Sequence, residues 1–364
     1  MKKLIIFLVV VFLLTGCYDN IELDDLAIIS GVGVDYKDDK FYLTYEILSD
    51  TKTLENTTLQ SYTVSGSGKT ISEAFINTNY KVSKKAYFSH LKVLILSNEI
   101  VNGHFEKITD YIIRDTNLRS DFKVLVANNT SPEKILKNVD ENHPVASEVV
   151  VNLIDNEKYN NNLVIGETFR EILAKLISNK YDVILNTISI KDNEIAIDNS
   201  YIFKNFKYQD TLNKKNSALY NLLTKNISAL EFQKKYDKGI VAITITNSDS
   251  KIDITSNEIK LNLKLEGKII ENNPKFNLKN TNAYKKLNKD FETVIKKDLK
   301  KFINILQENN SDILGLEESY YKKTRKDNKD LWTTADIEVS VNLKINTKGF
   351  IFEVKEWKIN LHIL

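Results

Sequence analysis

Cysteine is almost absent from this sequence, which contains only one, Cys17, in 364 residues. A single thiol excludes intrachain disulfides and excludes metal sites built from several thiolates. A chain of this length can still bury a sizeable hydrophobic core without such cross-links. Proline and methionine are also rare, with three and one residues, and we draw no functional conclusion from either.

Neither sign of charge prevails. The chain has 51 lysines and arginines and 49 acidic residues, which give a formal net charge of +2. Lys2 and Lys3 precede Cys17, so the rest of the chain sums to zero. This balance gives no support for a nucleic-acid-binding protein or for steering of acidic substrates. Beyond the first 16 residues, no stretch approaches the roughly 18 apolar residues of a transmembrane helix.

The first residues have the layout of an export signal that ends in a lipid-attachment site. Two lysines precede an apolar run of 11 residues, Leu4–Leu14, and Thr15-Gly16-Cys17 follows it. As a helix this run would be roughly 16 Å long, too short for a hydrocarbon core of about 30 Å. The ending resembles the lipobox of bacterial lipoproteins, where the chain is cut before the cysteine and the thiol carries a diacylglycerol with fatty acids such as palmitate. We therefore predict a signal peptide at 1–16 and lipid attachment at Cys17.

Periodicity and turn signals predict an α/β fold of the α+β type, in three successive domains, each a mixed or antiparallel sheet with packed helices. The N-terminal α/β domain is expected at 17–182, the middle α/β domain at 183–275 and the C-terminal α/β domain at 276–364. In the first domain, strands are predicted near 27–35, 41–48, 60–65, 91–96 and 122–127, and helices at 70–82, 99–114, from Ser131 and over most of 145–178.

The clearest helix of the chain opens the third domain, where apolar residues from Leu287 to Leu306 recur at helical spacing on one face. Before it, the middle domain alternates apolar and polar residues in the way of half-buried strands. For the two domains together, strands are predicted at 183–190, 194–203, 240–246, 258–270 and 337–345, and shorter helices at 217–226 and 312–322. A turn at Gly349 and a final strand at 351–364 close the pattern.

One glycine-rich segment, Gly66-Ser67-Gly68-Lys69-Thr70, lies between a predicted strand and a predicted helix, as a phosphate-binding loop does. The full motif needs a glycine five residues before Gly68, where this chain has Thr63. No apolar strand that ends in a magnesium-binding aspartate accompanies it. We interpret the segment as a strand-to-helix turn and predict no bound cofactor.

Residues that would indicate catalysis or metal binding are sparse. The four histidines, His90, His104, His143 and His362, have no metal-site spacing. No Gly-x-Ser-x-Gly elbow is present, and the acidic residues are scattered. We therefore predict a protein that is not an enzyme and has no catalytic or metal-binding residues.

Two segments are rich in basic residues. Within 285–301, seven lysines lie mostly off the apolar face of the predicted helix, and 322–329 carries five more basic residues. Either segment is a solvated surface, or it meets anionic lipid headgroups or an acidic patch of a partner.

Short segments spread over nearly the whole chain match one known family in order and spacing. They are Gly16-Cys17-Tyr18-Asp19, Glu22, Leu26-Ala27, Gly33-Val34-Asp35, Tyr87–Val93, Arg114-Asp115 through Arg119, Phe203-Lys204, Lys207, Leu212-Asn213, Ser311–Gly315, Trp332 and Gly349. The chain thereby resembles the Ger(x)C lipoproteins, the C subunits of Ger-type germinant receptors of endospore-forming bacteria. It departs from the family pattern at Tyr18, Asp210 and Glu317, where the family usually has Trp, Gly and Gly.

The resemblance implies three α/β domains and no known catalytic residues. It also implies a complex with two membrane subunits, A and B, at the outer face of the spore inner membrane. Such a complex responds to small nutrients and triggers germination. Whether this subunit itself binds a nutrient does not follow from the resemblance.

Two other functions fit an anchored exported protein. A solute-binding lipoprotein of a membrane transporter would carry the same lipobox, but it would need two similar lobes that close on a ligand. An anchored hydrolase would need catalytic motifs that this sequence does not show.

Overall fold

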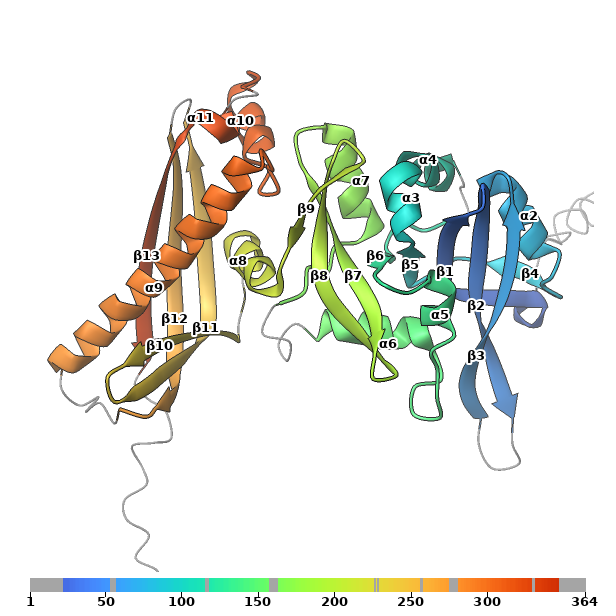
Figure 1. Cartoon of the computed structure of the whole chain (residues 1–364), viewed down its shortest axis with the longest axis horizontal. Coiled ribbons are helices and arrows are strands. Elements are labelled where there is room, and N and C mark those ends of the chain that lie inside the picture. The colour runs from blue at the N-terminus through green and yellow to red at the C-terminus, as the bar shows by residue number, and fades with distance from the viewer. Residues whose placement is uncertain are drawn as a thin grey trace, which may run out of the picture.

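The computed structural model describes residues 22–52, 57–114, 118–156, 163–225, 227, 229–255, 258–274, 281–328 and 331–346. The described strands form two sheets that follow one another along the longest axis of the molecule (Figure 1). Cys17, the predicted signal peptide, His362, Gly349 and the strand expected at 351–364 lie outside the described residues.

The larger sheet has nine strands in the order β3-β2-β1-β5-β6-β7-β8-β9, with β4 beside β1. Its centre is parallel (β1, β5, β6 and β7), and antiparallel hairpins extend it on both sides. The strands are β1 (Leu26–Lys37), β2 (Lys40–Lys52), β3 (Thr57–Gly68), β4 (Lys85–Tyr87), β5 (Val93–Leu96), β6 (Lys123–Ala127), β7 (Val183–Lys191), β8 (Glu194–Lys204) and β9 (Lys207–Leu212). A short 3₁₀ helix, η1 (Leu23–Asp25), precedes β1.

Helices cover both faces of this sheet, which is why its central strands are apolar on both sides. Leu94 and Leu96 of β5 belong to one core, and Val93 and Ile95 belong to the other. The first core contains α2 (Ile71–Asn79), α3 (Asn98–Gly103), α4 (Phe105–Arg114) and α7 (Phe169–Ser178); the second contains α5 (Pro132–Leu136) and α6 (Ala146–Asp155).

The smaller sheet has four strands in chain order, and one long helix packs on it (Figure 1). β12 and β13 are parallel, and the other pairs are antiparallel. The elements are α8 (Lys214–Thr224), β10 (Leu230–Tyr236), β11 (Gly239–Ile254), β12 (Glu258–Asn272), α9 (Thr281–Glu308), α10 (Leu316–Thr324), α11 (Leu331–Thr334) and β13 (Asp336–Asn346).

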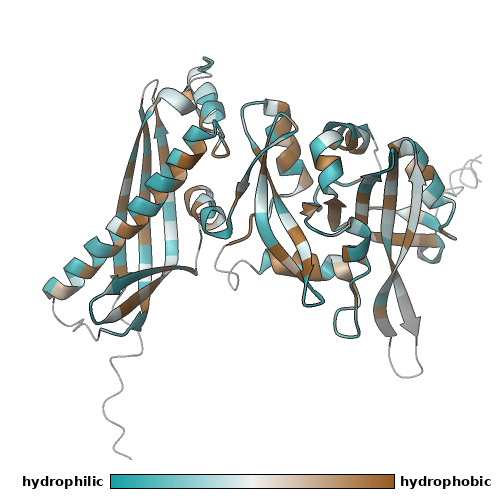
Figure 2. Cartoon of the chain, viewed as in Figure 1, coloured by the Kyte–Doolittle hydropathy of each residue, from teal (hydrophilic) through white to brown (hydrophobic). Residues whose placement is uncertain are grey.

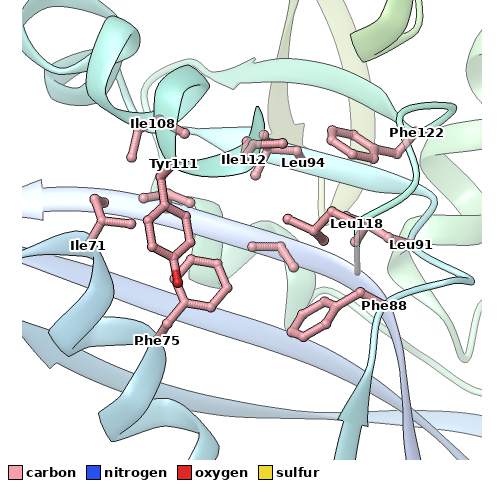
Figure 3. A pocket seen from close by; sticks show the side chains of 12 residues that line it. Ile71, Phe75, Phe88, Leu91, Leu94, Ile108, Tyr111, Ile112, Leu118 and Phe122 are labelled. Atoms are coloured by element: carbon pink, nitrogen blue, oxygen red, sulfur yellow. The ribbon is translucent and has the colours of Figure 1, made fainter. Parts of the chain in front are cut away.

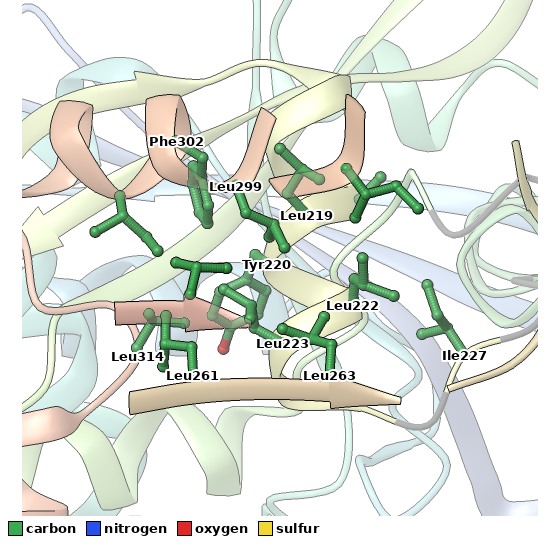
Figure 4. Packing of buried hydrophobic residues seen from close by; sticks show 14 of the residues in the cluster. Leu219, Tyr220, Leu222, Leu223, Ile227, Leu261, Leu263, Leu299, Phe302 and Leu314 are labelled. Atoms are coloured by element: carbon green, nitrogen blue, oxygen red, sulfur yellow. The ribbon is translucent and has the colours of Figure 1, made fainter. Parts of the chain in front are cut away.

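A single hydrophobic core joins the smaller sheet to the larger one. Side chains of α8, α9 and β12 meet in this core, which Figure 4 shows from close by. The same core includes Ile184 of β7, Ile202 of β8 and Leu212 of β9. The two sheets are therefore connected by apolar packing as well as by the chain.

The expected elements with strong periodicity are present, and the weaker ones needed correction. The long helix and the alternating strand at Leu261, Leu263 and Leu265 are confirmed, with all three leucines buried. The helix expected at 99–114 is two helices that meet at His104. The helix expected at 312–322 starts only at Leu316. Strands β4, β9 and β10 and helix α11 were not expected, because they are short or mostly polar.

The mixed α+β class is confirmed, but the sheets do not follow the expected domain boundaries. β7 pairs with β6, so the boundary at 182/183 lies inside the larger sheet. β12 pairs with β13, so the boundary at 275/276 lies inside the smaller sheet. The expectation of one sheet for each of three units is thus corrected to two sheets. Periodicity identifies strands but does not identify their pairing partners. The division of the chain into three domains stays a prediction.

Candidate functional site at the junction of the two sheets

The segment that follows α9 turns sharply twice. Asn310 has a left-handed backbone (φ 49°), and Ser311 N donates to Leu306 O at 2.8 Å, which ends the helix. Gly315 is also left-handed (φ 65°) and precedes α10. Between these turns, residues 311–316 are buried. We call residues 309–317, the loop 179–182 and the β8–β9 hairpin the junction.

Hydrogen bonds join this segment to the loop before β7. Asp312 N donates to Asp182 Oδ2 at 2.8 Å, and Asp182 N donates to Asp312 O at 3.1 Å. This reciprocal pair connects residues 130 positions apart in the sequence. Both aspartates are at most 5% exposed, so the pair holds the two regions of the chain together without competition from water.

The β8–β9 hairpin holds the same segment from another side. Lys204 Nζ donates to Asn310 O at 2.6 Å, and Gln209 Nε2 donates to Asn309 O at 3.1 Å. Asn309 Nδ2 donates in return to Asp210 Oδ2 at 2.6 Å. A lysine at the carbonyl end of α9 also interacts favourably with the helix dipole.

Gly315 is required by its backbone and by its neighbour. A Cβ at this position would lie 1.7 Å from Cζ of Tyr181, closer than any real contact. The left-handed backbone disfavours other residues as well. The ring of Tyr181 thus packs directly on the backbone of the second turn, and this glycine fixes how α10 approaches the larger sheet.

Three carboxyl groups gather at the junction with few compensating cations. Burial raises the pKa of Asp182 to about 6, although Lys204 opposes the shift. Burial and the charge of Asp312 raise the pKa of Glu317 to about 7. Burial also raises the pKa of Asp312, although its carboxylate accepts from the N–H groups of Leu316 and Glu317. Each group therefore binds a proton more readily in the folded chain than in water.

Two of the family segments found in the sequence meet here. Lys204 comes from the middle segment, and Ser311–Gly315 form the C-terminal one. Trp332, also in the family pattern, is fully buried and donates from Nε1 to Leu306 O at 3.3 Å, so it supports the end of α9. Asp182 and Tyr181 were not singled out in the sequence, because nothing local relates them to a segment 130 residues away.

Another buried carboxylate lies away from the junction, within the unit built on the larger sheet. Glu46 of β2 is 0% exposed. Its oxygens accept from Ser30 Oγ (2.9 Å), Ser61 Oγ (3.0 Å), Ala146 N (2.7 Å) and Ser147 N (3.1 Å). The last two are N–H groups of the first turn of α6, which have no carbonyl partner within the helix. The N-cap residue of α6 makes no side-chain hydrogen bond to them. Glu46 therefore caps this helix from another strand.

The glycine-rich segment is a strand end, as the sequence indicated. Gly66 and Gly68 lie in β3, and a Cβ on either would lie 2.5 Å from atoms of α2. Thr70 caps α2, and the Lys69 N–H donates to Glu73 Oε2 at 2.7 Å. The Lys69 N–H is thus already bound by a carboxylate, and the two glycines allow close packing of helix and strand.

The described histidines lie far from the junction in sequence and have separate surroundings. His104 packs against Tyr36 and Phe41, with ring centroids at 4.0 and 5.2 Å, and burial lowers its pKa. His90 is exposed. His143 was not expected at a metal site, yet single ligand atoms of Asp140, His143 and Glu194 lie within 4.8 Å of one another. All three are exposed, and Asp140 Oδ1 already accepts two backbone N–H groups.

A cavity in the first core of the larger sheet is too small for a nutrient. It holds about 20 Å³ and is lined by apolar and aromatic residues of β1, β5, α2 and α4 and of neighbouring loops, among them Phe75, Phe88 and Tyr111 (Figure 3). An apolar space of this size accommodates about one water-sized group and offers little to bind it. An amino acid or a sugar would need the surrounding core to open.

Two family models match the chain. The spore germination protein N-terminal domain matches residues 19–190, and the domain described as spore germination B3/GerAC like, C-terminal, matches residues 198–349. The short interval between the two matches falls at the β7–β8 hairpin. No helix among the described residues is long and apolar enough to cross a membrane.

Known proteins match over most of their length. The chain is 22% identical to spore germination protein KC of Bacillus subtilis (strain 168), over 95% of this chain and 93% of the relative. It is 25% identical to spore germination protein GerQC of Bacillus cereus, over 93% and 98%. The crystal structure of the GerBC protein matches with a TM-score of 0.51 and 16% identity, over 86% of this chain and 96% of that one. This likeness shows that the fold is shared.

Proposed function

Because the chain belongs to the Ger(x)C, or GerAC-like, family of spore germination proteins, we propose that it is the lipid-anchored C subunit of a germinant receptor. In this role it acts in nutrient-triggered germination together with the A and B membrane subunits, at the outer face of the spore inner membrane. The observation that carries the proposal is the pair of family matches, which follow one another along residues 19–349. The lipobox ending in Cys17 supports the anchor.

The subunit works through protein contacts and not through a reaction. The described junction contains buried carboxyls, but no nucleophile is activated by a neighbouring base there. A lipid on Cys17 would keep the folded units close to membrane partners and raise their effective concentration. With two or three acyl chains, such an anchor is stable.

The junction gives this role a physical basis. It fixes the orientation of the smaller sheet relative to the larger one through the reciprocal hydrogen bonds of Asp182 and Asp312 and through a glycine–tyrosine contact. A partner that binds one unit would thereby also position the other. The two units differ in strand number and order, so the described chain does not favour the two similar lobes of a solute-binding lipoprotein.

Replacing the anchor thiol tests the proposal. In spores that carry Cys17→Ala, we expect the protein to leave the membrane fraction and the nutrient response to be lost or strongly delayed. Asn20→Ala, which changes a residue three positions after Cys17 but keeps the thiol, serves as the control and should behave as wild type. Normal membrane retention together with normal germination of the Cys17→Ala spores would refute the anchored mechanism.

A further inference from the structure

Helix α9 carries a one-sided row of lysines. Lys285, Lys286, Lys289, Lys296, Lys297, Lys300 and Lys301 are all exposed, and at about 100° per residue they fall within an arc of about 160°. The apolar residues of the helix are buried on the opposite side, against the smaller sheet. Figure 2 shows the hydrophilic residues along this helix. The row is about 24 Å long. We call it the α9 lysine face.

The three acidic residues between Lys285 and Lys301 do not neutralise this face. Asp290 pairs with Lys234 at 2.9 Å, and Asp298 pairs with Lys215 at 2.7 Å. Glu292 accepts from the Leu343 N–H of β13 at 3.0 Å. These three acids thus bind groups of neighbouring elements. None of the seven lysines has an ion pair with a described residue.

The other basic segment behaves differently. Lys322 pairs with Glu318 at 3.2 Å, and Lys323 donates to Ile254 O at 3.0 Å. These groups are used within the fold. On α9, in contrast, Lys296 and Lys300 are four residues apart, as are Lys297 and Lys301, and such like-charged pairs weaken a helix. A charge row that opposes folding and has no partner in the described chain indicates an external anionic partner.

We infer that the α9 lysine face binds an anionic lipid surface. Among the described residues, no exposed large hydrophobic side chain lies on α9, so the contact is electrostatic adsorption without insertion. The helix contains no arginine, and the planar guanidinium group of arginine is the one that suits a fixed acidic site on a protein. The ammonium group of lysine is a point charge, which suits a mobile layer of lipid headgroups. Each lysine near such a surface adds to the attraction within a Debye length.

The position of the face relative to the chain start supports a membrane partner. Cys17 precedes the first described element, η1, by six residues, a span of at most about 20 Å. In Figure 1, β1, which follows η1 directly, lies toward one end of the long axis, and α9 lies toward the other. A lipid at the start and the lysine face at the far end would hold the molecule along the bilayer at two points. The inference rests on the proposed anchor for this two-point arrangement only.

Vesicle binding without the anchor tests the inference. Every described strand pairing and core lies at or after residue 22, so a chain of residues 22–364 keeps the fold. We expect this chain to sediment with vesicles of phosphatidylglycerol and phosphatidylcholine at low salt, and not with pure phosphatidylcholine. Binding should weaken at least tenfold when the salt is raised from about 0.05 to 0.5 M, because the Debye length shrinks.

Matched charge variants locate the surface. Changing Lys289, Lys296, Lys297 and Lys300 to Gln should reduce binding to anionic vesicles about 100-fold or more. Changing Lys235, Lys238, Lys264 and Lys268 to Gln removes four exposed lysines from β10, β12 and the β10–β11 turn of the same unit, and vesicle binding should change less than threefold. Far-ultraviolet circular dichroism should show both variants folded.

Two results would overturn the inference. One is equal loss of binding in both variants, which would indicate net charge and not the α9 lysine face. The other is no binding of the unaltered chain to anionic vesicles, which would leave an acidic protein as the partner of this face. Neither result would bear on the proposed place in a germinant receptor, which depends on Cys17 and on the partner subunits.

Discussion

Glu46, Asp182 and Asp312 are all at most 5% exposed, but Glu46 and the junction carboxyls are stabilised in opposite ways. Four donors from the same unit surround Glu46, two of them N–H groups at the start of α6. At the junction, Asp182, Asp312 and Glu317 crowd together, and their pKa values are raised. The carboxylate inside the larger-sheet unit therefore has hydrogen-bond donors on both oxygens. The negative charges of the carboxylates between the units are balanced only in part by donors and cations.

This difference indicates where the molecule is rigid and where it can respond. The Glu46 site stabilises a connection within the larger-sheet unit. At the junction, ionised carboxylates are buried close to one another, which is unfavourable. The stability of this contact between the two units therefore depends on the protonation of its carboxyls. We expect changes in pH or in junction residues to affect the relation of the two units before they affect either sheet.

Removal of Glu46 should have the largest effect on stability. Glu46→Ala leaves the N–H groups of Ala146 and Ser147 without their acceptor, whereas the two serine hydroxyls keep backbone carbonyl acceptors. We expect the free energy of unfolding to fall by about 3–5 kcal/mol. Urea unfolding followed by circular dichroism measures this. Glu106→Ala, at an exposed position of α4, is the control and should change stability by less than about 0.5 kcal/mol. A loss below about 1 kcal/mol for Glu46→Ala would contradict the comparison.

Substitution of Gly315 should have the next largest effect, and it should act on the junction. Gly315→Ala introduces a left-handed alanine and a clash with Tyr181, for a combined loss of about 2–4 kcal/mol. Limited proteolysis between the two units should become faster while each sheet stays folded. In a protein that already carries Tyr181→Ala, the clash is absent. Adding Gly315→Ala should then lower the free energy of unfolding by only about 1 kcal/mol. Additive losses would show that the two residues do not interact.

The pH dependence of stability that arises at the junction should be smaller. The pKa of Asp182 rises from 3.8 to about 6 on folding, and that of Glu317 rises from 4.5 to about 7. The folded chain therefore holds protons that the unfolded chain has released, and these groups lose their stabilising contribution as the pH rises from about 4 to 7. For Asp182, which is 4% exposed, we expect about 1–3 kcal/mol.

An isosteric variant isolates this contribution. Asp182→Asn keeps an oxygen for the Asp312 N–H but cannot ionise, so its stability relative to wild type should improve as the pH rises from 5 to 7.5. Unfolding curves at several pH values measure the difference. Asp249→Asn, at an exposed position of β11, should follow the wild-type curve. A constant difference between Asp182→Asn and wild type across this range would contradict a raised pKa.

The elements of the fold could largely be predicted, because their signals are local. The apolar face of α9 and the alternation of β12 are readable from neighbouring residues alone. Strand pairing was not predictable: β7 joins β6 and β12 joins β13, so two sheets replace three. The polar sequences of β9 and β10 gave no strand signal, because their pairing partners and not their composition hold them in place.

The junction could be predicted only in part. Lys204 and Ser311–Gly315 belong to the family segments, and Lys204 bonds to Asn310, directly before the second of them. Asp182 and Tyr181 carry no local signal, and their roles depend on a contact with Asp312 and Gly315 across 130 positions. Glu46 was missed for the same reason, since two of its donors lie about 100 residues away. Cys17 stays a prediction, because it lies outside the described residues.

Identification of the partners tests the central claim most directly. The tagged full-length protein would be purified from detergent-solubilised spore membranes, and the chains that copurify would be identified by mass spectrometry. A germinant receptor subunit predicts two polytopic membrane proteins in the eluate, corresponding to the A and B subunits. A transporter permease with its ATPase in their place would contradict the account and would assign the protein to the solute-binding lipoproteins.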